Sequence, residues 1–141
     1  MATDDNHNRY PFDHPNCDSF GGFTMIAAPE LTYEAIFRAL QNGDYYASGG
    51  PEIRGVWIED GFIHIECAPC EEIILACGSR RAERVARGNG PALTGAKFPL
   101  QKNDGYVRLE ISDEKGNRAY TRAYFPGDDF DESVYEGSRD Q

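Results

Sequence analysis

The chain lacks a hydrophobic run long enough to cross a bilayer, and it lacks internal repeats and low-complexity tracts. A membrane-spanning helix needs about 20 consecutive apolar residues, and a secretory signal pattern is missing as well. Basic residues are few, with 14 Lys and Arg against 24 Asp and Glu and a formal net charge of −10. Because phosphate backbones and anionic lipids attract positive charge, we expect neither nucleic acid nor membrane as a partner, and we expect a cytoplasmic location.

Cysteine is also scarce, and its spacing leaves two interpretations open. Cys67-Ala68-Pro69-Cys70 has the spacing of zinc ligands. No second Cys-x-x-Cys exists to complete a zinc site, Cys17 lies far away, and Cys77 closes an apolar run. Buried, reduced thiols are therefore favoured over a zinc knuckle, and an oxidised preparation would allow a disulfide between Cys67 and Cys70.

What the chain does contain is a strong β pattern in its second half. With 141 residues, 40% of them hydrophobic, it is long enough for one core without staples. Two runs with a period of two, Ile53 to Glu59 and Phe62 to Cys67, flank Asp60-Gly61, a pair typical of a type I′ hairpin turn. Further strands are predicted at Glu72 to Cys77, Arg81 to Arg87, Tyr106 to Asp113 and Arg118 to Phe125. Short antiparallel strands at this spacing favour a β-sandwich.

One helix is predicted upstream of these strands, from Tyr33 to Asn42. Thr32 suits its N-cap and Gly43 its C-terminal glycine. A short extended segment precedes the helix near Phe23 to Ala27. The apolar residues of the helix fall at i, i+3, i+4 and i+7, so we expect one face to pack in a core. These residues are Tyr33, Ile36, Phe37 and Leu40.

A candidate metal-binding pair lies at the start of the chain. Asp5 and His7 are two positions apart, and alternate residues of a strand point to one face. A carboxylate and an imidazole are ligand types that divalent metals accept. Asp5 and His7 could therefore reach one ion from a strand end.

Three segments together resemble the C-terminal end of PHP-domain proteins, the polymerase-and-histidinol-phosphatase superfamily of metal-dependent phosphoesterases. The likeness extends over about residues 2 to 125, and its most specific part is the run from Tyr46 to Pro51. In that family an Asp-x-His motif is followed by a last helix, a Gly-x-x-Tyr-Ala-Ser-x-Gly-Pro turn and, in one branch, an all-β region. The three segments here are Ala2 to Asn8, Leu31 to Leu40, and Asn42 to Ile53.

The resemblance implies a fragment that is inactive alone. The family's earlier ligands, including a His-x-His, would precede residue 1, and this chain has three histidines and no His-x-His. In a full-length parent, Asp5 and His7 would help to bind a divalent metal (Mn, Zn, Mg or Fe), and water activated by that metal would hydrolyse a phosphorylated small molecule. We expect no tightly bound metal here. The missing N-terminal barrel, or a second copy of the chain, would cover the helix.

The expected architecture is mainly β with one helix, an antiparallel β-sandwich preceded by the last strand or loop and the helix of a truncated PHP barrel. Residues 1–50 would be the barrel remnant, 51–125 the sandwich and 126–141 an acidic, mostly disordered tail. The alternative function is a non-catalytic binding or assembly module. An exposed aromatic groove around Trp57, Tyr106 or Tyr120 would favour this alternative.

Other polar and aromatic residues have weaker functional readings. The basic cluster could clamp phosphate, but a solvated strand face with ordinary ion pairs is favoured, with Arg81, Glu83 and Arg87 on one side. His14 is a second metal candidate because a carboxylate adjoins it in a loop, and His64 is expected to face solvent or a neighbouring strand. Packing is favoured over ligand stacking for Tyr45 to Pro51. The cluster comprises Arg80, Arg81, Arg84 and Arg87.

Overall fold

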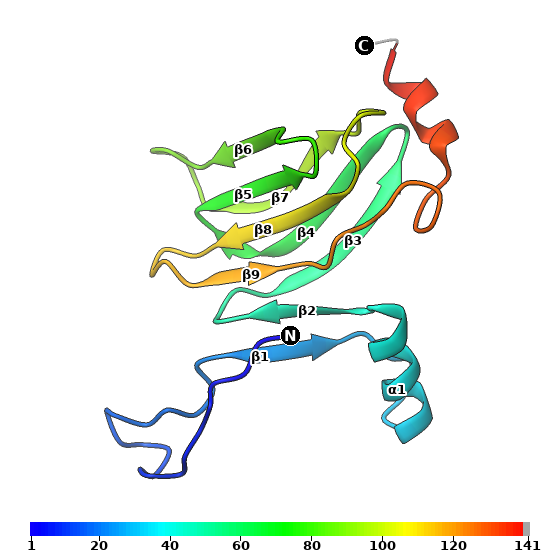
Figure 1. The fold of residues 1–141 in the computed structure, drawn as a ribbon. Coiled ribbons are helices and arrows are strands. Elements are labelled where there is room, and N and C mark those ends of the chain that lie inside the picture. Colours follow the sequence, from blue (N-terminus) through cyan, green and yellow to red (C-terminus); the bar gives the residue numbers. More distant parts are fainter. Residues whose placement is uncertain (140–141) are drawn as a thin grey trace.

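Two antiparallel sheets packed face to face form the body of the protein (Figure 1). The computed structural model describes the backbone of residues 1–139 and the side chains of residues 1–135. A six-stranded sheet has the order β1-β2-β9-β8-β5-β6, and a three-stranded sheet has the order β3-β4-β7. The strands are β1 (Phe23–Ile26), β2 (Tyr45–Ser48), β3 (Ile53–Glu59), β4 (Phe62–Cys70), β5 (Glu72–Cys77), β6 (Ala82–Ala86), β7 (Leu93–Pro99), β8 (Val107–Ser112) and β9 (Arg118–Tyr120).

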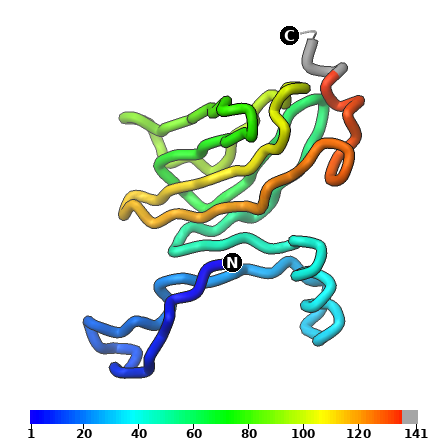
Figure 2. The backbone as a smooth tube through the Cα atoms, in the orientation of Figure 1, coloured from blue at the N-terminus to red at the C-terminus, as the bar shows by residue number. Residues whose placement is uncertain are grey.

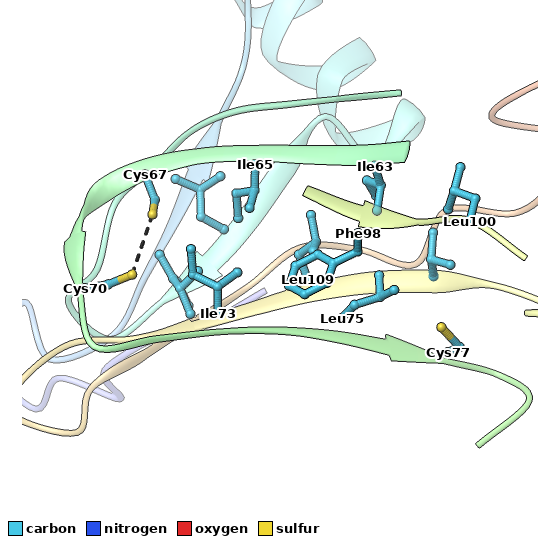
Figure 3. Close-up of a cluster of buried hydrophobic side chains, with 14 of the residues drawn as sticks. Ile63, Ile65, Cys67, Cys70, Ile73, Leu75, Cys77, Phe98, Leu100 and Leu109 are labelled. Atoms are coloured by element: carbon cyan, nitrogen blue, oxygen red, sulfur yellow. Dashed lines mark hydrogen bonds between the residues drawn. The ribbon is translucent and has the colours of Figure 1, made fainter. Parts of the chain in front are cut away.

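Alternate residues of the central strands fill the space between the sheets (Figure 3). In β4, for example, Ile63 and Ile65 are buried while His64 between them is directed to the outer face. The mainly β, one-helix, sandwich-like fold expected from the sequence is confirmed. The side chains with essentially no exposed surface are Phe98, Ile63, Ile73, Leu75, Leu100, Leu109, Ile111, Val107, Asp104, Cys67, Cys70 and Ser48.

The hairpin of β3 and β4 turns at the predicted residues. Asp60 and Gly61 both have left-handed φ values, 50° and 81°, as a type I′ turn requires. β4 is longer than expected and continues to Cys70, with a register shift between Glu66 and Cys70. Such a bulge bends a strand, and here it precedes the step from the three-stranded sheet into β5 of the other sheet.

The helix α1 (Tyr33–Asn42) has the predicted bounds and caps. The Thr32 side chain accepts a hydrogen bond from Ala35 N at 3.3 Å, and Gly43 closes the helix at φ 79°. Its apolar face, however, packs only in part: Ile36 and Leu40 are half-buried, whereas Phe37 is 48% exposed. Tyr33 is 82% exposed, and Ala39 is the one buried residue of the helix. The reason is position, because α1 lies at the β1 end of the sheet, away from the three-stranded sheet (Figure 1).

Two strands were not predicted, and one is shorter than expected. β2 lies in the segment interpreted as a corner and pairs with both β1 and β9, so the six-stranded sheet includes strands on both sides of residue 50. The backbone trace in Figure 2 shows β1 and β2 running side by side. β7 pairs with β4 although its sequence contains Gly95 and ends on Pro99. β9 ends at Tyr120 instead of continuing to residue 125.

Part of the acidic C-terminal segment, which was expected to be mostly disordered, has regular structure. A 3₁₀ segment, η1 (Glu132–Arg139), follows β9 after a loop. Tyr135 is only 7% exposed, and Phe130 and Val134 pack against the core cluster. These apolar residues, which lie between acidic ones in the sequence, hold the segment against the sandwich core. Residues 140 and 141 lie outside the described part of the chain.

Candidate functional site

The N-terminal segment lies alongside the residues that lead into β1. Ala2 and Thr24 exchange two hydrogen bonds of 3.0 Å, in which the Ala2 amide donates to Thr24 Oγ1 and that hydroxyl donates to the Ala2 carbonyl. A Cβ on Gly22 would meet the Thr3 carbonyl oxygen at 2.8 Å, so only glycine permits this approach. Further along, Asn6 Nδ2 donates to Ser19 Oγ. The two segments therefore run in opposite directions, which brings His7 to Asp18.

Asp5 and His7 are not on a strand, and this corrects the basis on which they were paired. Residues 1–9 carry no strand or helix, and Asp5 has a left-handed φ of 50°. Alternation between the two faces of a strand therefore does not apply to them. Both residues are exposed, and the His7 side chain retains 56% of its accessible surface. Whether they bind one metal stays a prediction.

Asp18 is the neighbour of His7 that sequence reasoning missed. Its Oδ2 atom accepts a hydrogen bond of 3.1 Å from the His7 backbone amide and lies 3.9 Å from His7 Nδ1. Its other oxygen, Oδ1, is buried without a hydrogen-bond partner. No spacing rule could have found this pair, because eleven residues of irregular loop separate its members.

The residue types at this place suit a divalent metal better than their arrangement does. A carboxylate and an imidazole are ligand types that manganese, zinc or iron accept, and the Asp18 carboxylate lies 3.9 Å from His7 Nδ1. Among the described side chains of residues 1–135, however, no group of three or more His, Cys, Asp or Glu is placed to hold an ion. His14, the second candidate, accepts a hydrogen bond from Asn16 N on Nδ1 and stacks on Tyr10 at 4.4 Å.

The Cys67 and Cys70 pair is a buried dithiol. Both thiols are free, they are 0% and 2% exposed, and their sulfur atoms are 3.7 Å apart (Figure 3). Burial, followed by the neighbouring Cys70, raises the pKa of Cys67 to about 12. Zinc binds the thiolate, and no third ligand group accompanies this pair among the described side chains. The structure thus shows both thiols buried and free, and whether the pair binds zinc stays a prediction.

The arginine cluster forms ion pairs, but Arg81 does not lie on a solvated face as expected. Its guanidinium donates two hydrogen bonds, of 2.8 and 2.6 Å, to the carboxylate of Asp104, which is 1% exposed. The Asp104 hydrogen bond is the main cause that raises the pKa of Arg81. Arg84 pairs with Glu72, and Arg87 with Glu71. Three of the four arginines of the cluster are therefore paired with carboxylates around β5, β6 and the loop that holds Asp104.

A groove of about 580 Å³ opens between the β1–β2 end of the large sheet and β3. Tyr46 on its wall also packs against the core cluster. Arg122, which also lines the groove, donates to Asp129 at 2.6 Å and lies 4.5 Å from the Tyr124 ring. Its cation is therefore already paired. The groove combines aromatic surface with charges of both signs, and it marks the junction of the β1–α1–β2 unit with the sandwich.

The outer face of the three-stranded sheet carries a strip of aromatic and basic side chains. Trp57 is 45% exposed and stacks on His64 with ring centroids 5.1 Å apart. Lys97 lies 4.7 Å from the centre of the Phe62 ring. His64 thus faces a neighbouring strand, as expected, and Trp57 presents aromatic surface to solvent. Tyr106, by contrast, packs on Phe125 at 5.8 Å.

Comparison with known proteins adds no relative. No protein-family model, no curated protein and no solved structure matches the chain. None of the helices among residues 1–139 has the length and apolar character that crossing a membrane would require. The function must therefore be argued from the geometry described above.

Proposed function

We propose that this chain is the C-terminal, non-catalytic part of a PHP-type metal-dependent phosphoesterase. In this proposal the β1–α1–β2 unit docks on a catalytic barrel, and Asp5 and His7 add two ligands to a metal held mainly by that barrel. The observation that carries the proposal is the uncovered apolar face of α1. Tyr33 and Phe37 are 82% and 48% exposed, and Leu31, just before the helix, is 92% exposed.

The helix is short for one with so little burial. A helix of 10 residues is marginal in water on its own, and apolar surface gathered on one face marks an interaction site. Phe20, in the loop that leads to β1, is 75% exposed as well. The sandwich core, in contrast, is closed by its own strands. A partner that covers α1 and the N-terminal loop would bury the apolar side chains that these segments leave exposed.

The small number of ligands in this chain supports the proposal that a barrel supplies the others. A metal that activates water and binds a phosphate needs several converging ligands, and the described side chains include no group of three or more ligating residues placed to hold an ion. The barrel would supply the remaining ligands and the pocket for a phosphorylated small molecule. The free thiols agree with the reducing cytoplasm as the place of action.

A phosphatase assay tests the catalytic half of the proposal. The 141-residue chain, supplied with Mn²⁺ and p-nitrophenyl phosphate, should show no turnover above the metal alone, because its coordination shell is incomplete. The same chain extended upstream in its own gene should be active, and Asp5→Ala should lower that activity by at least tenfold. Turnover by the 141-residue chain that Asp5→Ala abolishes would overturn the claim that it is inert alone.

Hydrogen exchange tests the docking half. In the isolated chain, the amides of residues 1–30 and α1 should exchange much faster than those of β4 and β5, because few apolar contacts hold them. In the extended protein the same amides should become protected. Strong protection of this region in a monomer of the isolated chain would count against a missing barrel as the cover.

A second candidate function is supported by the half-exposed Trp57. Together with His64, Phe62 and Lys97 it forms an aromatic and basic surface, and a sugar or a planar ring could stack on the exposed part of Trp57. This module would bind ligand without catalysis. Quenching of the fluorescence of Trp57, the sole tryptophan, during titration with soluble oligosaccharides tests it. Quenching that Lys97→Ala weakens would favour this reading, and an unchanged spectrum would remove it.

A further inference from the structure

We propose that β3 accepts an extended strand from a partner protein. The strand adds antiparallel to the outer edge of the three-stranded sheet and fills the groove between β3 and the β1–β2 end of the large sheet. The partner segment carries apolar residues at alternate positions and basic residues at its ends. This inference goes beyond the proposed function and does not depend on it, because it uses neither a metal nor a barrel.

The outer edge of β3 carries backbone groups that no strand of the described chain pairs. β3 is a terminal strand of its sheet, with β4 as its neighbour. Leu100 N donates to Gly61 O, in register with the pairing of β4 and β7. Because antiparallel pairs alternate, odd-numbered residues from Gly61 to Ile65 bond to β7 and even-numbered ones to β3. Val56 lies opposite Ile65, so the Val56 amide and carbonyl point away from β4.

The inner face of β1 and β2 is uncovered at the same place. Met25 and Tyr46 are cross-strand partners and share one face, and Tyr46 packs against the core cluster. Met25 is nevertheless 46% exposed. Both residues line the groove together with Val56. A strand bonded to β3 would lie about 4.8 Å beyond it, so its inward side chains would cover Met25.

The charges around the groove favour basic residues at the ends of the added strand. Four charged residues line it, and two of them are arginines. Arg122 is paired with Asp129 at 2.6 Å, and Arg54 lies 3.6 Å from Glu52. Asp44 is the remaining charged residue of the lining and is exposed. The β3–β4 turn, at the other end of β3, begins with an acidic residue as well, so Lys or Arg near both ends would complement the edge.

The width of the large sheet argues for a foreign strand over a second copy of the chain. An antiparallel junction of β3 with β3 of a second copy would place the β1 and β2 strands of both copies in one layer past the shared edge. There they would collide, because each large sheet extends beyond its own β3 (Figure 1). A single added strand brings no such layer with it.

A synthetic peptide tests the strand addition. The probe is the acetylated and amidated heptapeptide Lys-Val-Thr-Val-Thr-Val-Lys, whose valines share one face of a strand. During titration of the nitrogen-15-labelled chain, amide resonances of residues 53–58 should shift, and those of β6, the edge at the far end of the large sheet, should not. With the valines facing inward, their amides bond to β3 and the threonine amides face solvent.

N-methylation of the peptide separates backbone pairing from side-chain contact. Methylation of the central valine nitrogen should weaken binding by about tenfold or more, because a hydrogen bond to β3 is lost. Methylation of one threonine nitrogen is the matched control and should leave the affinity unchanged. Equal affinities of the two methylated peptides, a shift centred on β6, or no shift at millimolar peptide would each overturn the proposal.

A substitution in β3 tests the same edge from the side of the protein. Val56→Pro removes the outward N–H, which proline tolerates on an edge strand, and should abolish the peptide-induced shifts. Val56→Thr keeps the N–H and the branched side chain and should retain them. The methylated peptides decide the question on the unchanged chain if Val56→Pro does not fold. A dimer of the chain that Val56→Pro dissociates would identify a second copy as the occupant and overturn the foreign strand.

Discussion

The sandwich and the β1–α1–β2 unit have similar apolar patterns and opposite degrees of burial. Phe98 in β7 is 2% exposed, whereas Phe37 in α1 is 48% exposed and Tyr33 82%. The difference arises from sheet width. Six strands form one sheet and three the other, so the strands and the helix at the β1 end extend past the layer that would cover them (Figure 1).

The comparison shows that an apolar stripe predicts an interface without predicting whether this chain or a partner covers it. Both regions satisfy the sequence rules for core packing. Only in the sandwich do the partner surfaces lie within this chain. The exposed stripe on α1 is therefore best explained as an interface, and the following predictions measure how far the two regions differ.

The largest expected effect comes from removing the same side chain in each region. Phe98→Ala should lower the free energy of unfolding by about 3–5 kcal/mol, because it leaves a cavity in a closed core. Phe37→Ala should change it by less than about 0.5 kcal/mol, as exposed substitutions usually do. Urea unfolding followed by circular dichroism measures both. Equal losses would show that α1 belongs to the same cooperative core as the sandwich.

A smaller loss should follow from Asp104→Asn in the sandwich. The carboxylate is buried against Arg81 and also accepts from the Gln101 amide at 2.8 Å. An amide there can accept fewer of these hydrogen bonds and leaves the guanidinium poorly matched, which should cost about 1–3 kcal/mol. Asp128→Asn, at an exposed position, is the control and should be neutral in the same urea assay. A neutral Asp104→Asn would show that the buried pair adds nothing net.

Alkaline pH should weaken the sandwich through its buried thiols. Burial raises the pKa of Cys67 to about 12 from 9.0, so the unfolded chain loses this proton at lower pH than the folded one. The thiol's contribution is therefore complete below pH 9.0 and is lost as the pH rises toward about 12. Unfolding free energy should be lower at pH about 10.5 than at pH about 8.

Two cysteine substitutions, at Cys67 and at Cys17, test the origin of that pH dependence. Cys67→Ala should reduce the drop between the two pH values, because the buried titrating group is gone. Cys17→Ala removes a thiol that is less buried than Cys67. The loss of unfolding free energy between the two pH values should then be the same as in the unchanged chain. A drop of the same size in all three proteins would assign the alkaline loss to other groups.

The smallest effect is confined to α1. Thr32→Ala removes the side chain that caps the helix and should cost about 1 kcal/mol of helix stability. Since the helix buries only Ala39, its amides should exchange about fivefold faster while the unfolding free energy stays the same. Thr32→Ser keeps the cap and should behave like the unchanged chain. A matching loss of global stability would mean that α1 and the sandwich unfold together.

Local rules predicted those elements whose signals are local. The bounds of α1 follow from Thr32 and Gly43, and the β3–β4 turn from Asp60-Gly61. β7 was missed because Gly95 and Pro99 weaken its pattern, and pairing with β4 is what makes it a strand. β2 was interpreted as a corner for the same reason, since its partners β1 and β9 lie at opposite ends of the sequence.

For the candidate site, the sequence indicated the ligand types and nothing of their surroundings. Asp5 and His7 were found by residue type and spacing, but the left-handed φ of Asp5 removes the strand geometry on which their pairing relied. Asp18 could not be found, because a loop with no period brings it to His7. Side-chain contacts between irregular segments depend on the whole fold, and no short pattern encodes them.

By itself the sequence determined the local structure of this protein: the helix with its caps, the hairpin turn, the alternation of the core strands and the strong negative charge. These depend on backbone preferences and on the period of a segment. The tertiary structure decided which apolar faces are covered, that Arg81 is buried against Asp104, and that Asp18 lies beside His7. Each of these depends on which distant segments meet, and that is settled by sheet order and sheet width.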